Sequence, residues 1–87
     1  MLEKAEFVTE EYKECILHKG GIYTGKKLFN KRHGKGKFIF CDGYTYIGEW
    51  HNDKINGEGT LYNKAGRIFY QGQWLNGEWH GAGKQYN

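Results

Sequence analysis

The sequence has no proline, only two cysteines and few of the side chains that usually build a core. Leu, Ile, Val and Phe account for 17 of its 87 residues, a share close to the level at which disorder is suspected. The net charge is only +3, however, so charge repulsion does not keep the chain unfolded. Seven Tyr and three Trp supply apolar area, since each aromatic ring buries roughly 150–250 Å². We therefore expect one small domain held together by rings.

Other absences exclude whole classes of protein. No apolar run approaches the ~18–20 residues of a transmembrane helix. The acidic segment 1–11 lacks the apolar stretch of a signal peptide. Cys15 and Cys41 form no CxxC pair, and we interpret them as reduced packing residues rather than a disulfide or a metal pair. The expected location is the cytoplasm.

Glycine, in contrast, is abundant and periodic. Of the 14 glycines, 12 recur at four positions in steps of 23 or 24 residues, and three of the tyrosines recur with them. A fixed period of this length indicates a repeat architecture, in which one small unit is stacked several times. We divide the chain into a flank or cap over 1–12 and a repeat module over 13–87. The module contains a half-repeat over 13–22 and repeats over 23–45, 46–69 and 70–87.

The pattern within a repeat is typical of strands. Tyr46, Gly48 and Trp50 alternate with Ile47 and Glu49, and this period of two places the first three on one face. Each repeat is then a two-stranded hairpin. Consecutive hairpins predict an all-β fold, an elongated single-layer antiparallel meander.

The spacing also predicts the turns and the register. The polar segment 51–56 is expected to be the hairpin loop, and the turn over 41–43 closes the other end. Trp50 is expected to oppose Gly57, with Gly48 opposing Gly59, so that each ring covers a bare stretch of backbone.

The two ends of the chain differ from the repeats. Leu2, Ala5, Val8 and Tyr12 lie at near-helical spacing, which predicts a short N-terminal helix that caps the first hairpin. The segment 84–87 resembles a strand whose partner is missing. We expect this edge to be covered by further repeats or by a neighbouring subunit.

The pattern Tyr-x-Gly-x-Trp, a variable loop, then Gly-x-Gly and a further Gly resembles the MORN repeat (membrane occupation and recognition nexus). It recurs three times in register and covers roughly residues 13–87. The resemblance implies an elongated, twisted single-layer sheet with an aromatic-lined groove. It also implies scaffolding roles in ciliary, cytoskeletal and membrane-junction proteins and in lipid-kinase regulatory segments. Lys27 stands at the position of Trp50 and Trp74, which interrupts the groove near its N-terminal end.

The aromatic face is the first candidate site. Part of the ring stripe packs against its neighbours, and the remainder is expected to be an exposed apolar surface of the kind that marks an interaction site. A helix or an extended peptide of another protein is the expected occupant. The predicted protein-binding groove consists of Tyr46, Trp50, Tyr70, Trp74 and Trp79.

A basic run is the second candidate site. Lys35 and Lys37 share a strand face, and Lys26 and Lys31 are placed to flank the same hairpin. The run is either a solvated surface or the site of an anionic partner such as an inositol lipid headgroup, an acidic tubulin-like tail or nucleic acid. Nucleic acid is disfavoured because the rings lie over glycines and the chain also carries 10 acidic residues. The six cations of the run are Lys26, Lys27, Lys31, Arg32, Lys35 and Lys37.

No residue pattern indicates catalysis. The segment 20–26 fits the GxxxxGK skeleton of a phosphate-binding loop, but Lys27 replaces the Ser or Thr that would hold magnesium. His33 and His80 occupy the repeat slot of Asn56, so we interpret them as turn residues and predict no metal or cofactor. An enzyme would also need different groups converging in a pocket, which a single-layer sheet does not offer.

The sequence therefore predicts a non-enzymatic scaffold that binds other proteins, within a cytoskeletal or ciliary/flagellar assembly. The alternative is a peripheral membrane adaptor that binds acidic phospholipids through the Lys26–Lys37 run. A regulatory fragment of an enzyme is a third possibility. Binding through the basic run should weaken steeply as salt rises, whereas binding through the rings should not.

Overall fold

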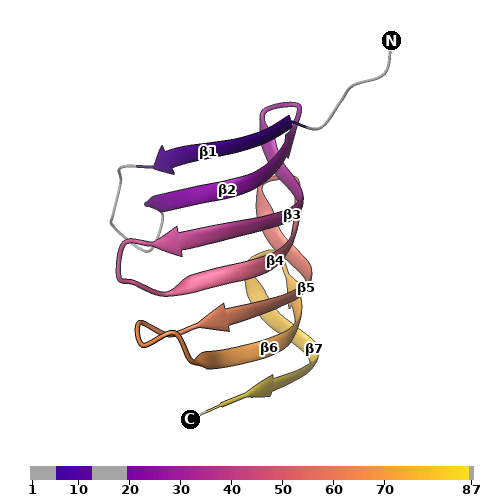
Figure 1. Cartoon of the computed structure of the whole chain (residues 1–87). Coiled ribbons are helices and arrows are strands. Elements are labelled where there is room, and N and C mark those ends of the chain that lie inside the picture. Colours follow the sequence, from indigo (N-terminus) through magenta and orange to yellow (C-terminus); the bar gives the residue numbers. More distant parts are fainter. Residues whose placement is uncertain (1–5, 13–19, 87) are drawn as a thin grey trace.

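Seven antiparallel strands form one open sheet in the computed structural model, which describes residues 6–12 and 20–86 (Figure 1). Each strand pairs with the next one in the chain, so the predicted all-β meander is confirmed. No helix occurs in these two described ranges. The strands are β1 (Glu6–Tyr12), β2 (Gly21–Leu28), β3 (Lys31–Phe40), β4 (Thr45–His51), β5 (Lys54–Tyr62), β6 (Ile68–Leu75) and β7 (Glu78–Gln85).

The three hairpin turns at one end of the sheet each contain two residues. Both residues of every turn have positive φ, which is the geometry of a type I′ turn and matches the twist of the flanking strands. The expected loop over 51–56 is therefore too long, because His51 already pairs with Lys54. The turn residues are Phe29–Asn30, Asn52–Asp53 and Asn76–Gly77.

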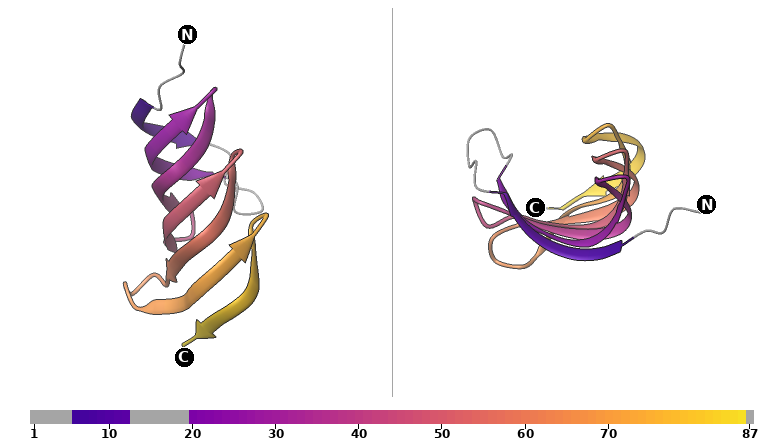
Figure 2. Two further views of the ribbon diagram at one scale, coloured as in Figure 1. Left: turned by 90° about the vertical axis from the view of Figure 1, so that its right-hand side faces the viewer. Right: turned by 90° about the horizontal axis from the view of Figure 1, so that it is seen from above.

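A row of glycines crosses the sheet from β2 to β7. The absence of Cβ atoms along this row lets a ring lie directly on the backbone. A Cβ on Gly36 would lie 2.5 Å from the hydroxyl oxygen of Tyr23, a separation that real atoms do not tolerate. The sheet itself is curved into a trough (Figure 2, right). Paired in order, the row is Gly25, Gly36, Gly48, Gly59, Gly72 and Gly83.

The predicted register is correct for Gly48 and Gly59 but wrong for Trp50, which opposes Ile55. One residue separates Gly48 from Trp50 on β4, whereas three separate Gly59 from Ile55 on β5. Gly57 lies in this bulge with φ +104 and instead opposes Trp74 of the following repeat. The ring over Gly59 is that of Tyr46, from the same repeat.

The hydrophobic core is a single layer of side chains on the concave face. The rings are buried against one another and against the backbone of the trough, although no second sheet covers them within the described part of the chain. The molecule is elongated, with principal extents of 47 × 29 × 19 Å. The buried side chains are Tyr23, Phe38, Tyr46, Trp50, Ile55, Tyr70 and Trp74.

The N-terminal helix predicted over residues 1–12 is wrong, because residues 6–12 form strand β1. β1 pairs along the open edge of β2, and Val8 and Tyr12 pack against the core. A helix would have left the hydrogen-bonding groups of β2 unpaired, whereas β-branched and aromatic residues such as these favour a strand. Residues 1–5, and 13–19 of the expected half-repeat, lie outside the described residues.

The expectation of reduced cysteines is also wrong at Cys41, which is disulfide-bonded. Cys41 lies in the turn between β3 and β4, where the Gly43 N–H donates to the Phe40 carbonyl at 3.0 Å. Cys15 lies outside the described residues.

Candidate functional site

The concave face carries a groove with a volume of about 1170 Å³. It extends from β1 to β7, so it draws on every repeat rather than on one. Most of its lining is aromatic or aliphatic, with a few charged side chains among them. The lining residues are Tyr12, Arg32, Phe38, Phe40, Asp42, Tyr44, Trp50, Asp53, Lys54, Ile55, Leu61, Phe69, Trp74, Asn76, Gly77 and Trp79.

A ladder of rings forms the floor of the groove. Trp50 stands edge-on between Tyr23 and Tyr46, with ring centres 5.3 and 5.6 Å apart. Trp74 stands in the same way between Tyr46 and Tyr70, at 5.3 and 5.2 Å. Each tryptophan therefore joins two repeats through edge-to-face contacts, which are favourable for aromatic pairs.

The tyrosine hydroxyls fasten this ladder to the backbone. Each donates a hydrogen bond to the carbonyl three residues later, in the same way in all three repeats. Burial raises the pKa of Tyr23 to about 12 and also raises the pKa of Tyr46, since it disfavours the charged phenolate. The bonds are Tyr23 to Lys26 (2.6 Å), Tyr46 to Glu49 (2.8 Å) and Tyr70 to Gln73 (2.9 Å).

The C-terminal end of the groove is apolar and open. The ring of Trp79 stacks on Tyr70 with centres 4.6 Å apart, yet 43% of the residue stays exposed. Phe69 contacts Trp79 at 5.9 Å and Tyr44 at 5.6 Å. These side chains add accessible aromatic surface beside the buried ladder.

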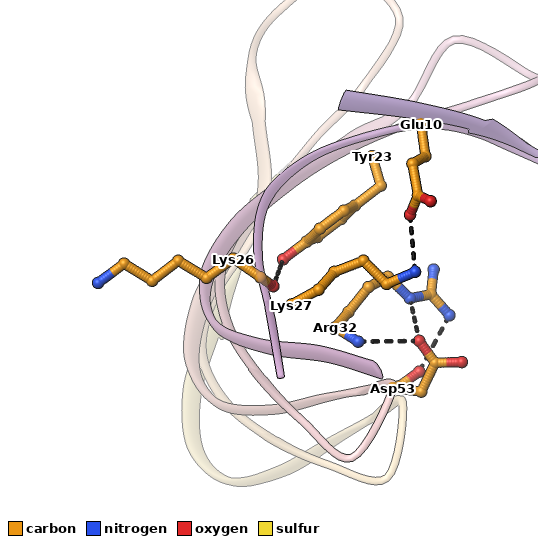
Figure 3. Close-up of polar contacts among 6 residues, drawn as sticks. All are labelled: Glu10, Tyr23, Lys26, Lys27, Arg32 and Asp53. Carbon is orange, nitrogen blue, oxygen red and sulfur yellow. Dashed lines mark hydrogen bonds and ion pairs between the residues drawn. The ribbon is translucent and has the colours of Figure 1, made fainter. Parts of the chain in front are cut away.

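The N-terminal end of the groove is charged. Arg32 lies over the ring of Trp50, 4.5 Å from its centre, and its Nε donates to Asp53 Oδ1 at 2.6 Å. Lys27 Nζ donates to Glu10 Oε1 at 2.7 Å. Figure 3 shows both pairs inside the curve of the sheet. Lys27, in the second of these ion pairs, holds the repeat position that Trp50 and Trp74 hold in the later repeats.

These ion pairs shift two pKa values. The hydrogen bond to Glu10 raises the pKa of Lys27, although partial burial opposes the shift. Partial burial acts to raise the pKa of Asp53, but the hydrogen bonds and charge of Arg32 outweigh it and lower the pKa. Both groups are thus held in their charged forms.

Arg32 keeps unused hydrogen-bonding capacity at the groove. A guanidinium has five N–H donors. Nε bonds the Asp53 carboxylate, and Nη2 bonds the Asp53 carbonyl at 3.0 Å, which leaves three donors without a hydrogen bond to the described residues. Its side chain is only 15% exposed, so a carboxylate arriving there would meet a partly desolvated cation.

The structure divides the predicted basic run between two faces. Lys27 and Arg32 are paired on the concave face, whereas Lys26 points the opposite way, outside the curve (Figure 3). Lys35 and Lys37 are exposed and alternate with Gly36, whose position faces the concave ring of Tyr23, so they share the convex face. Lys31 is exposed next to the hairpin turn.

The predicted aromatic stripe is likewise divided, by depth. Tyr46, Trp50, Tyr70 and Trp74 are buried in the core, and only Trp79 offers much surface. The charged N-terminal end was not predicted as part of the groove. The sequence feature that marks this end of the groove is the run of cations. Their acidic partners could not be identified from it, because Glu10 and Asp53 lie far from Lys27 and Arg32 in the sequence.

The tryptophans differ in one detail. The Trp74 indole N–H donates to the Gly59 carbonyl at 3.1 Å, whereas the buried N–H of Trp50 has no partner in the described part of the chain. Sequence alone gives no sign of this difference, since the two residues hold the same repeat position.

The other candidates of the sequence analysis, the phosphate-binding skeleton and the histidines His33 and His80, lie in strands of the sheet, apart from Gly20. Gly21–Leu28 is strand β2, so the GxxxxGK skeleton is not followed by a helix. His33 and His51 have rings 5.2 Å apart, but no group of three potential metal ligands occurs among the described residues. Over the same residues, no helix is long and apolar enough to cross a membrane.

Comparison with known proteins gave one family and two informative relatives. A sequence model of the MORN repeat matches residues 23–43, 46–66 and 70–86. A probable serine/threonine-protein kinase of Dictyostelium discoideum is 36% identical over 64 residues, covering 64% of this chain. Phosphatidylinositol 4-phosphate 5-kinase 1 of Oryza sativa subsp. japonica is 40% identical over 45 residues, covering 52% of this chain. The chain spans only 4% and 6% of the lengths of these two relatives.

Proposed function

Because the chain belongs to the MORN repeat family, and its repeats build one continuous groove, we propose that it is a non-enzymatic module that binds a segment of another protein. The observation that carries the proposal is the concave groove, with its aromatic floor and its accessible end at Trp79. An exposed aromatic surface beside a preformed groove is typical of interaction sites.

The chemistry of the groove suggests the chemistry of its partner. Apolar side chains of a helix or extended peptide would contact Phe69 and Trp79 at one end. An acidic side chain or a C-terminal carboxylate would bind the free donors of Arg32 at the other end. A partner with both features would bind in one direction only.

The wider setting is also part of the proposal. We place the module in a cytoplasmic scaffold, within a cytoskeletal or ciliary assembly, on the basis of its resemblance to repeats of that kind. The two relatives are kinases far longer than this chain, and they support the idea that such repeats work beside other domains.

Selection from a displayed library of random peptides tests the groove. We expect the wild-type protein to enrich peptides with apolar residues and one acidic position. Trp79→Ser should reduce this enrichment, because a tryptophan that becomes buried at an interface often contributes about 2 kcal/mol or more. Lys84→Ser on β7, which is exposed and outside the groove lining, is the control. Equal enrichment by wild type and Trp79→Ser would contradict the proposed site.

The exposed lysines favour a second candidate function, a peripheral membrane adaptor. Lys26, Lys31, Lys35 and Lys37 carry four charges without an ion pair among the described residues, and a basic residue near an anionic membrane contributes ~1 kcal/mol. The relative named as a phosphatidylinositol 4-phosphate 5-kinase is consistent with work near lipids. Vesicle binding that falls steeply with salt would support this function, and the absence of vesicle binding at low salt would reject it.

A further inference from the structure

The tip of the β2–β3 hairpin contains an unusual residue. Phe29 has φ +52, in the left-handed region, and forms the first position of a type I′ turn. The corresponding positions of the other two hairpins are Asn52, with φ +53, and Asn76, with φ +51. Asparagine adopts this conformation readily, whereas a bulky aromatic residue is rarely found there. The backbone of this turn therefore favours asparagine, which the other two hairpins have at this position, over phenylalanine.

The packing of the chain does not account for Phe29 either. The residue is 68% exposed, and it forms no ring contact among the residues that the structure describes. A residue that strains its own backbone and buries little surface in its own chain is explained more readily by a contact outside the chain. The tip lies at an open end of the sheet (Figure 2, left), where, among the described residues, the neighbouring turn bonds to β3 only through Asp53 and Arg32.

The surroundings of Phe29 indicate what that contact is. Exposed cations lie on both sides of the turn, with Lys26 three residues before Phe29 and Lys31 two residues after it. Phe7 pairs opposite Lys26 and is 72% exposed, which places a second exposed ring near the tip. The basic run from Lys26 to Lys37 contains no acidic residue. The nearby carboxylates are those of Glu6, opposite Lys27 on β1, and of Asp53, which is paired with Arg32.

We propose that the β2–β3 tip is a membrane anchor: Phe29 enters the boundary between headgroups and acyl chains of an anionic bilayer, while Lys26 and Lys31 contact the headgroups. An apolar side chain among cations is the combination that binds such surfaces. This inference rests on the second candidate function and adds to it a specific anchor. It predicts that charge alone does not account for binding, so part of the affinity persists in salt.

The decisive variant is Phe29→Asn, which gives the first hairpin the residue of the other two. It should leave the melting temperature unchanged or raise it, because asparagine tolerates the turn conformation. Its binding to phosphatidylcholine vesicles that contain phosphatidylserine should fall at least about tenfold, as expected for losing a buried phenylalanine. Loss of folding then cannot explain loss of binding. The reverse exchange in the second hairpin, Asn52→Phe, should lower the melting temperature. It measures how much a phenylalanine in this left-handed conformation destabilises the fold.

A second variant reports insertion directly. Phe29→Trp should retain vesicle binding, and its added fluorescence should be quenched by lipids brominated on their acyl chains. Tight binding without such quenching would overturn insertion and would point to headgroup contact alone.

The outcomes separate the anchor from the function on which it rests. If the wild type and Phe29→Asn bind the vesicles equally, the anchor is wrong but the membrane adaptor stands. If the wild type does not bind at low salt, both are wrong, and the groove proposal is unaffected. If Phe29→Asn melts well below the wild type, the backbone argument for an outside contact fails.

Discussion

At the scale of single residues, the glycines of this chain meet two different needs. Gly59 has no positive φ, but a Cβ there would collide with the ring of Tyr46, so its requirement is steric. Gly77 has φ +86, and a Cβ there would meet no other atom within 4 Å, so its requirement is conformational. The sequence marks Gly59 by its period and marks Gly77 by the Asn76-Gly77 pair, which is typical of a two-residue hairpin turn.

The same substitution at both positions separates these needs. Gly59→Asn should destabilise the fold by about 1–3 kcal/mol or more, because the side chain overpacks the tyrosine ring. Gly77→Asn should change stability by less than about 0.5 kcal/mol, because asparagine tolerates positive φ and already occupies this slot as Asn30. Denaturant unfolding measures both. Similar losses for the two variants would contradict the packing of Tyr46 on Gly59.

Tyr23 makes stability depend on alkaline pH. Its pKa is raised from 10.0 to about 12 in the folded state, because burial disfavours the phenolate. Its contribution is therefore complete below pH 10 and is lost as the pH rises through about 12. We expect the free energy of unfolding to fall across this range, measured by denaturant titration at several pH values.

Tyr23→Phe provides the control for this pH dependence. It removes the titrating group while keeping the ring, so its stability should fall less steeply with pH than that of the wild type. Identical slopes would show that Tyr23 is not the group responsible, and Tyr46, whose pKa is raised as well, would be tested next.

At the scale of elements, the sequence predicts what depends on local period and misses what depends on distant partners. The alternation around Gly48 identifies β4 and its glycine pairing with β5, because both follow from the repeat. The strand at Glu6–Tyr12 resembles a helix in sequence, since the spacing of a few residues cannot reveal that β2 has a free edge. In the sequence, Lys27 resembles an interruption of the groove. Its partner Glu10 lies on β1, whose pairing with β2 the sequence does not reveal.

The β4–β5 turn is fastened to β3 by a small network. Asp53 Oδ1 accepts from both the backbone N–H of Arg32 at 3.1 Å and its Nε, and the Asp53 N–H donates to the Arg32 carbonyl at 2.9 Å. The network links two hairpins, so its loss should weaken the stacking of the first two repeats.

This network predicts a loss of stability in acid. The pKa of Asp53 is lowered below 3.8, so its contribution is present above that pH and is lost as the pH falls through the folded-state pKa. Asp53→Asn should destabilise the protein at neutral pH and flatten the acid dependence, measured by thermal melting. Glu58→Gln is the matched control, because Glu58 is exposed and its carboxylate has no ion pair among the described residues. An equal effect of the two variants would contradict the network.

At the scale of the whole molecule, the trough gives the chain two faces with different chemistry. The concave face holds the rings and the two ion pairs, and the convex face presents Lys26, Lys35 and Lys37 to solvent. The curvature of the sheet thus divides the basic run. Lys27 and Arg32 form ion pairs on the concave face, whereas the lysines of the convex face stay accessible. Reversing the charge of the whole run would change stability and binding together, because Arg32 supports the core.

Variants confined to one face should therefore have separate effects. Lys35→Glu with Lys37→Glu should leave melting and peptide selection nearly unchanged, because exposed charges contribute little to stability, but should weaken binding to anionic vesicles. Trp79→Ser should weaken peptide selection and leave vesicle binding nearly unchanged, since the Trp79 ring faces the groove and lies away from the convex lysines. Peptide selection and vesicle binding measured on both variants check this. If each variant impaired both activities equally, one shared surface would have to replace the two faces.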